Sequence, residues 1–118
     1  MPIPPALSSL SFPTFHWDRA LQAAEKEQDT RPTWVYPWPA GTRLLQELDQ
    51  VCEVKGKRVC DLGCGQGYLG FGALLLHANV VSFCDGSQHP LDYISACLAE
   101  NELQDRGHCL QHRWGSKI

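Results

Sequence analysis

The stretch Val59-Cys60-Asp61-Leu62-Gly63-Cys64-Gly65-Gln66-Gly67-Tyr68-Leu69-Gly70 decides the fold, because three kinds of local sequence follow one another in it. A short apolar run at residues 58–62 enters a glycine cluster, and the apolar segment 68–77 follows. Such a run predicts a strand, spaced glycines predict a tight turn, and an apolar segment of that length predicts a helix. The order is therefore strand, glycine-rich turn, helix.

The sequence after this stretch continues the alternation. Residues 80–84 are β-branched and aromatic and predict a second buried strand, and residues 90–101 predict an amphipathic helix. Residues 107–113 predict a third strand. Strands that alternate with helices of about ten residues predict an α/β fold with a parallel sheet and right-handed crossovers.

The chain is expected to divide into an N-terminal region and a second region that contains the motif. Residues 1–33 are expected to form an N-terminal arm and a short helix. The arm, up to about residue 17, is rich in Pro and Ser and is expected to be peripheral, and the helix is expected over Trp17–Gln28. Residues 34–118 form the ligand-binding domain. Its first helix is expected over residues 43–54, with Thr42 as the N-cap. The face of this helix that we expect to be buried carries Leu44, Leu45, Leu48, Val51 and Cys52.

The composition narrows the class of protein. A chain of 118 residues with 43% hydrophobic and 19% charged residues is one small domain or a fragment of one. The net charge is −3 and no basic stripe is present, so we expect no direct contact with nucleic acid. The sequence has no leader pattern and no apolar stretch that could span a bilayer, so no membrane association is expected either.

Six cysteines in a short chain raise the question of a disulfide scaffold. Most of them lie within predicted strands or helices, as Cys60 and Cys84 do, and there a free cysteine behaves as a small buried hydrophobe. Cys60 and Cys64 lack the spacing of a zinc ligand pair, so no metal is expected. Reduced thiols indicate a cytoplasmic or nuclear location, or both.

The glycines point to a ligand. Gly63, Gly65 and Gly67 alternate after a strand, which lets backbone N–H groups and a helix N-terminus face a nucleotide-like molecule. The spacing from Gly65 to Gly70 also matches the dinucleotide fingerprint. Asp61, two positions before Gly63, distinguishes the two cases, because a carboxylate repels pyrophosphate and attracts a sulfonium ligand with a free amino group. We therefore favour S-adenosylmethionine over a dinucleotide.

Asp85 is the second candidate ligand-binding residue. It ends the second predicted strand, is followed by Gly86, and lies at the distance from the glycine loop at which a ribose-binding acid is expected. A carboxylate there accepts hydrogen bonds from both ribose hydroxyls. The alternative is a turn or helix-capping aspartate. The glycine loop upstream favours the ribose.

With these residues in place, the sequence resembles the seven-strand, class I S-adenosylmethionine-dependent methyltransferases that modify lysine, or in one branch histidine, on other proteins. Residues 59–70 are similar to the family's first motif and residues 84–87 to its second. Residues 38–40, Trp-Pro-Ala, are similar to the element before its first core helix. Residues 112–115 resemble its Trp-Gly pair near the cofactor's adenine.

The resemblance implies a Rossmann-like class I methyltransferase fold and S-adenosylmethionine as cofactor. The cofactor-binding residues that it implies are Trp38, Asp61, Gly63, Cys64, Gly65, Gly67, Asp85, Gly86 and Trp114. Packing is the alternative role for the two tryptophans. No catalytic residue is assigned, because in-line methyl transfer requires positioning of a nucleophile and exclusion of water.

The chain departs from the family pattern at Ile118, where it stops just past the Trp-Gly pair. We therefore expect the N-terminal half of the fold only, with about three parallel strands, flanking helices and an open apolar edge. The expected function is methyl transfer to a protein side chain, lysine or histidine, with a protein substrate as partner. The alternatives are a small-molecule methyltransferase and a truncated, noncatalytic isoform that binds a partner or the cofactor.

Overall fold

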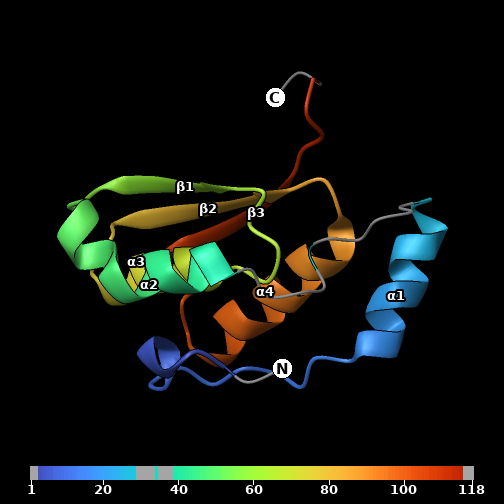
Figure 1. The fold of residues 1–118 in the computed structure, drawn as a ribbon, viewed down its shortest axis with the longest axis horizontal. Helices are drawn as coiled ribbons and strands as arrows, with labels where there is room; N and C mark the ends of the chain where they lie inside the picture. Colours follow the sequence, from blue (N-terminus) through green and yellow to red (C-terminus); the bar gives the residue numbers. More distant parts are fainter. Residues whose placement is uncertain (1–2, 29–33, 35–38, 116–118) are drawn as a thin grey trace.

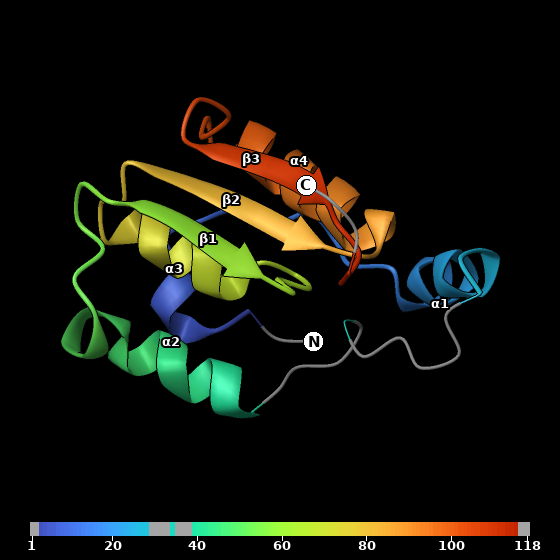
Figure 2. The ribbon, with the colours of Figure 1, turned by 90° about the horizontal axis from the view of Figure 1, so that it is seen from above.

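The computed structural model describes residues 3–28, 34 and 39–115. Three parallel strands lie side by side in the order β1-β2-β3, as Figures 1 and 2 show. The strands are β1 (Arg58–Leu62), β2 (Val80–Asp85) and β3 (Gly107–Gln111). The helices are η1 (Pro5–Leu7), α1 (Trp17–Lys26), α2 (Pro39–Val51), α3 (Tyr68–Leu75) and α4 (Gln88–Glu100). The predicted parallel α/β arrangement is confirmed.

The strand register aligns the carboxyl ends of the sheet. Leu62 of β1 lies opposite Cys84 of β2, and Asp85 lies opposite Gln111 of β3. The loops that leave β1 and β2 therefore start side by side. In open parallel sheets this edge is where ligands bind.

The helices α2, α3 and α4 lie on one face of the sheet (Figure 1). The core between them and the strands holds Phe71, Val81, Phe83, Leu91 and Ile94, all at most 1% exposed. Parallel sheets are ordinarily covered on both faces. In the described part of the chain the second face carries exposed side chains, among them Leu62, 57% exposed, and Leu110, 43% exposed.

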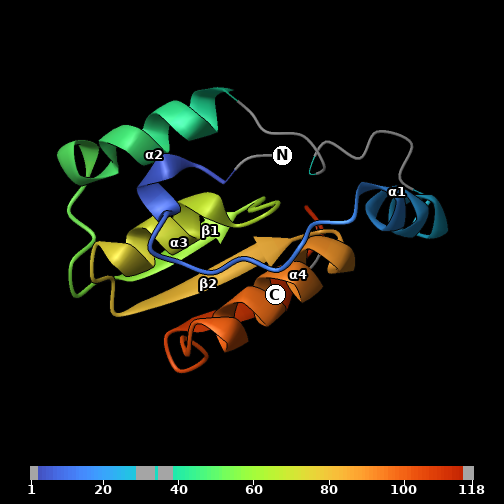
Figure 3. The same cartoon turned by 90° about the horizontal axis from the view of Figure 1, so that it is seen from below.

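The N-terminal arm is not peripheral. The segment between η1 and α1 runs across α3 and α4 on the side away from the sheet (Figure 3). Leu7 is fully buried, and the Phe12 ring packs edge-on against Tyr68 and Phe71 at centroid distances of 5.6 and 5.4 Å. Ser11 N–H donates to Asn101 Oδ1 at 2.8 Å. The arm is therefore held against α3 and α4 by its apolar side chains, which extend the core, and by a hydrogen bond from its backbone.

Helix α2 begins earlier than the sequence predicted. It starts at Pro39, so Thr42 is an interior residue and its assignment as N-cap is wrong. Proline suits the first helical position because its missing N–H has no helical partner there.

The buried face of α2 is narrower than predicted. Leu45 and Leu48 are buried, whereas Leu44, Val51 and Cys52 are exposed. The reason is that α2 packs mainly on α3, and so closely that a Cβ on Gly72 would collide with Leu45 Cδ1.

All six cysteines are free thiols. Cys84 and Cys97 are buried, as predicted, but Cys60 is exposed because it lies on the uncovered face of the sheet. Among the described residues, no helix combines the length and the apolar character that a membrane crossing needs.

Candidate cofactor-binding site

The glycine loop after β1 meets the end of β2. Gly65 N–H donates to Asp85 Oδ2 at 2.9 Å, and Cys64 N–H donates to the Cys84 carbonyl at 2.9 Å. Gly67 N–H donates back to the Cys64 carbonyl at 2.8 Å, which closes the turn before α3. The two sequence motifs therefore form one site at the carboxyl edge of the sheet.

The three loop glycines have positive φ angles, 64° at Gly63, 54° at Gly65 and 82° at Gly67. L-residues with a side chain adopt this region at a cost. Their surroundings differ. A Cβ on Gly67 would lie 2.8 Å from Ile94 Cδ1 and 3.1 Å from the Phe83 ring, whereas a Cβ on Gly63 would meet nothing within 4 Å. Gly67 is required by packing, and Gly63 presents open backbone on which a ligand can lie.

Asp61 connects β1 to the start of α3. Its Oδ2 accepts a hydrogen bond from Gly70 N–H at 3.0 Å. Glycine is required at position 70 because a Cβ there would collide with the Phe83 ring. The carboxylate thus satisfies a free N–H of the first helical turn. The resemblance implies that Asp61 bonds the amino-acid end of the cofactor or the glycine loop, whereas the donor to Asp61 in the structure is Gly70 N–H, in the first turn of α3.

The pKa of Asp61 is raised from 3.8 to about 6. Burial is the largest cause, the hydrogen bond from Gly70 opposes it, and the negative charge of Asp85 raises the pKa further. Two acidic side chains thus lie close enough to interact at one end of the sheet. Such a site favours a cationic ligand over a phosphate.

Each carboxylate oxygen of Asp85 accepts one hydrogen bond from a backbone N–H group. Oδ2 accepts from Gly65 N–H and Oδ1 from Ser87 N–H, both at 2.9 Å. The bond to Ser87 is the turn role that sequence left open, and it does not exhaust the carboxylate, because each oxygen has a second lone pair. The Gly86 carbonyl accepts from Gln111 Nε2 at 3.1 Å, which fixes this turn to β3.

Cys64 contributes to the hydrogen bonds of the glycine loop through its backbone N–H and carbonyl groups. Burial, with the charges of Asp61 and Asp85 as smaller causes, raises the pKa of its thiol well above the ordinary value of 9.0. The side chain is therefore a neutral thiol and not a nucleophile at physiological pH.

Of the two tryptophans predicted to contact the cofactor, the structure describes Trp114 and not Trp38. Trp38 lies outside the described residues. Trp114 follows β3 and is 77% exposed, so it does not pack within the described part of the chain. Its contact with a cofactor stays a prediction.

Two further residues were missed by sequence reasoning. Trp34 is 8% exposed, its Cβ would lie 3.7 Å from a Cβ on Gly65, and its ring centroid is 5.6 Å from that of His89. Gln66, within the glycine loop, is 7% exposed. Neither Trp34 Nε1 nor the two amide atoms of Gln66 have a hydrogen-bond partner among the described residues.

Unpaired buried polar atoms cost about 1–3 kcal/mol each, so their presence at one loop calls for an explanation. A bound polar ligand would supply the missing partners. The available signals were the polar side chain between two loop glycines and the aromatic, proline-rich segment around Trp34.

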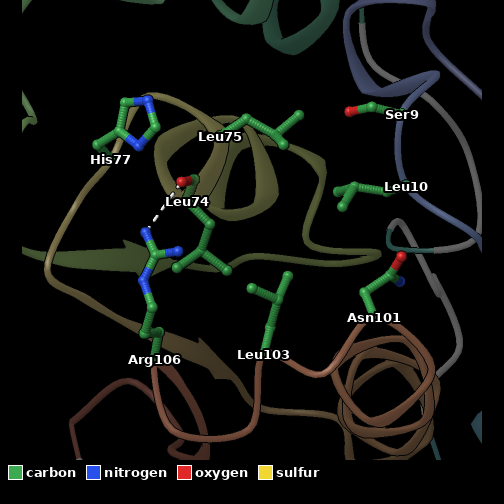
Figure 4. A pocket seen from close by; sticks show the side chains of 8 residues that line it. All are labelled: Ser9, Leu10, Leu74, Leu75, His77, Asn101, Leu103 and Arg106. Atoms are coloured by element: carbon green, nitrogen blue, oxygen red, sulfur yellow. Dashed lines mark hydrogen bonds between the residues drawn. The ribbon is translucent and has the colours of Figure 1, made fainter.

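A separate cavity of about 280 Å³ lies between the C-terminal ends of α3 and α4 and the N-terminal arm (Figure 4). Leu10 from the arm, Leu74 from α3 and Leu103 line it, with Arg106 and His77 at one side. Arg106 donates to the carbonyls of Leu74 and Ala78 at 3.0 and 2.7 Å, so its guanidinium caps the end of α3. The described residues contain no group of three or more metal-ligating side chains.

A parallel sheet with a glycine loop after its first strand and an acid after its second is a Rossmann-like arrangement that dinucleotide-binding domains share with class I methyltransferases. The additional carboxylate of Asp61 before the loop favours the methyltransferase class. Comparison with known families agrees: the model of the family described as "Methyltransferase small domain" matches residues 39–116. The chain belongs to this methyltransferase family.

Two curated relatives are named as protein methyltransferases. Protein N-lysine methyltransferase METTL21A of Danio rerio is 32% identical over 120 residues, a match covering 97% of this chain and 54% of that protein. Ribosomal protein L11 methyltransferase of Synechococcus elongatus is 33% identical over 94 residues, covering 63% of this chain and 31% of that protein. The chain thus spans about half the length of the first relative and a third of the second.

Solved structures share the fold. PH1948 from Pyrococcus horikoshii, a proposed RNA methyltransferase, superposes with a TM-score of 0.56 at 25% identity and covers 89% of this chain and 47% of its own. PRMT6 with SAH superposes with a TM-score of 0.53 at 23% identity and covers 60% of this chain and 21% of its own. The predicted Rossmann-like class I fold is confirmed.

Proposed function

We propose that the carboxyl edge of β1 and β2 binds S-adenosylmethionine and that the protein transfers the cofactor's methyl group to a side chain of another protein. The observation that carries this proposal is the hydrogen bond from Gly65 N–H to Asp85 Oδ2 at 2.9 Å. It unites the loop that would hold the amino-acid end of the cofactor with the acid that would hold its ribose.

The chemistry of the site fits this cofactor. S-adenosylmethionine carries a positive sulfonium and an ammonium group, and Asp61 and Asp85 supply negative charge at the same edge. The unpaired buried amide of Gln66 and the indole N–H of Trp34 supply donors and an acceptor beside the loop. A pyrophosphate would instead meet two carboxylates, which supports the methyl donor over a dinucleotide.

Methyl transfer requires no covalent bond between the reactants and a side chain of the protein. The sulfonium methyl is displaced in line by a neutral nucleophile, so the protein's tasks are to orient cofactor and acceptor and to exclude water. Asp85 would orient the ribose, and the open backbone at Gly63 would carry the amino-acid end. No side chain of this chain needs to form a bond to the methyl group.

Lysine is the first candidate acceptor, and histidine is the second. The names of both curated relatives support a protein acceptor, and one of them specifies lysine. The net charge of −3 favours a protein acceptor over RNA, because RNA binding is driven largely by basic side chains. A cytoplasmic or nuclear location, or both, stays part of the proposal.

The test is methyl transfer from isotope-labelled S-adenosylmethionine to the proteins of a cell lysate, read by mass spectrometry of methylated peptides. Wild type and Asp49→Asn, which removes an exposed carboxylate of α2, should label lysine or histidine side chains alike. Asp85→Asn should lose the labelling. Labelling of added small amines alone would establish the small-molecule alternative, and labelling of nothing would establish the noncatalytic one.

A further inference from the structure

Two thiols meet on the uncovered face of the sheet, one residue from the candidate site. Cys60 of β1 pairs in register with Ser82, and Cys84 of β2 pairs with Leu62, so the two cysteines are diagonal neighbours on that face. Their sulfurs are 3.5 Å apart, within hydrogen-bonding contact. A disulfide brings two sulfurs to about 2.05 Å, so closure requires a further approach of about 1.5 Å.

The two thiols differ in access. Cys60 is exposed, so a dissolved oxidant can reach its sulfur. Cys84 is 6% exposed and lies in register between Leu62 and Leu110 of the neighbouring strands. Burial raises the pKa of the Cys84 thiol to about 11, and its hydrogen bond with Cys60 adds to this shift. Cys84 is thus a buried, protonated thiol in contact with the exposed thiol of Cys60.

We propose that Cys60 and Cys84 are a redox-modification site that forms a reversible disulfide when a hydroperoxide reaches the uncovered face. The Cys60 thiolate attacks the outer peroxide oxygen, an S–O bond forms, the O–O bond breaks, and an alcohol or water leaves. Cys84 sulfur then attacks Cys60 sulfur, the S–O bond breaks, and water leaves with the Cys84 proton. The two thiols lose two electrons and two protons, and the peroxide is reduced.

The geometry also makes this disulfide easy to reduce. Directly opposed residues are the closest pairs of neighbouring strands, and Cys60 and Cys84 are two residues out of that register. Closure therefore draws the middle of β1 toward the end of β2 and leaves a strained bond. Strained, exposed disulfides are the readily reduced and regulatory kind.

The strain falls on the candidate site. The Cys84 carbonyl accepts the hydrogen bond of Cys64 N–H, and the next residue, Asp85, accepts that of Gly65 N–H. A shift of Cys84 displaces both acceptors of the glycine loop. As a deepening of the proposed function, and resting on it, oxidation weakens S-adenosylmethionine binding by about tenfold, the loss expected when one hydrogen bond to a charged group is broken.

The first experiment maps the bond without any ligand. The reduced 118-residue chain is treated with hydrogen peroxide and digested on the N-terminal side of aspartate, which separates the two cysteines because Asp61 lies between them. The expected product is a cross-link of Cys60 to Cys84 that has lost two hydrogen atoms and disappears with dithiothreitol. Cys60→Ser and Cys84→Ser should lack it. Cys52→Ser, which removes the other exposed cysteine, should retain it. Pairing of Cys60 with a different cysteine, or only higher oxides, would overturn the proposal.

The second experiment reads the effect on the loop. Amide hydrogen exchange at Cys64 and Gly65 should become faster in oxidised wild type and stay unchanged in peroxide-treated Cys60→Ser. Calorimetric titration with S-adenosylmethionine should show the tenfold weakening only in oxidised wild type. A cross-link that leaves exchange and affinity unchanged refutes the coupling. Absence of binding in the reduced chain refutes the proposed function, while the mapping and exchange results still decide the disulfide.

Discussion

Replacement of Gly67 by alanine should destabilise the fold more than the same replacement at Gly63. Both residues have positive φ, 82° and 64°, so both variants incur the backbone cost of about 1–2 kcal/mol for a left-handed L-residue. Only Gly67→Ala also inserts a methyl group 2.8 Å from Ile94 Cδ1 and 3.1 Å from the Phe83 ring. Overpacking of a core costs about 1–3 kcal/mol. The expected losses are therefore about 2–5 kcal/mol for Gly67→Ala and about 1–2 kcal/mol for Gly63→Ala.

The assay is urea unfolding monitored by circular dichroism. The free energies of unfolding are compared by linear extrapolation with the same dependence on urea concentration for both variants. Ligand binding should rank the two variants in the opposite order. Gly63→Ala places its methyl group in open space where the cofactor is proposed to lie, so among folded molecules it should lose more affinity for S-adenosylmethionine. An equal or greater loss of stability in Gly63→Ala than in Gly67→Ala would refute the assigned roles.

Three further predictions rest on single side chains. Burial raises the pKa of Asp61 from 3.8 to about 6, so between these values the folded chain holds a proton that the unfolded chain releases. The free energy of unfolding should therefore fall by about 2 kcal/mol as the pH rises from 4 to 6. Asp61→Asn should remove this difference in pH-dependent urea unfolding, and an unchanged profile would contradict the shift. Arg106→Met, which deletes the bonds to the Leu74 and Ala78 carbonyls, should cost about 2 kcal/mol in the same assay. Arg43→Met, which breaks the exposed pair with Glu47, should cost less than about 0.5 kcal/mol, and equal losses would argue against the capping role. Gln66→Met should raise stability by about 1 kcal/mol, because it removes unpaired buried polar atoms, and should weaken cofactor binding in calorimetry. A variant that binds as well as wild type would show that Gln66 does not contact the ligand.

The main elements of the fold were predictable because local signals and tertiary packing agree. Residues 58–62, 80–84 and 107–113 were predicted as strands, and the structure has strands at 58–62, 80–85 and 107–111. The glycine loop marks the turn after β1 because backbone geometry and packing, as at Gly67, admit no side chain. Asp61 and Asp85 were identified from their places in the sequence, two positions before Gly63 and at the end of the second strand, and the strand register brings the ends of β1 and β2 together.

The wrong predictions of burial have one physical origin: the sequence does not show which faces of the sheet and of the helices are covered by other elements. An apolar pattern cannot tell whether a second layer lies above it, so Cys60 was expected inside and is exposed. Leu44 and Val51 follow helical spacing, but the main packing partner of α2 among the described elements is α3, and both side chains are left exposed. The arm was judged by its prolines and serines, whereas Leu7 and Phe12 place it against the core.

Trp34 and Gln66 illustrate a different limit. A sequence shows that a polar atom exists, and only coordinates show that it is buried without a partner. Gln66 lay inside the glycine loop that the sequence had singled out. The role of both residues as candidate ligand contacts required the packing of Trp34 against Gly65.

The most direct test of the central claim is calorimetric titration of the reduced 118-residue chain with S-adenosylmethionine, with NAD as the competing ligand class. Wild type and Asp49→Asn should bind S-adenosylmethionine and not NAD, and Asp85→Asn should lose the binding while keeping its circular dichroism spectrum. Binding of NAD in preference, or equal affinity in Asp85→Asn, would contradict the assignment of the glycine loop and Asp85 to a methyl-donor site.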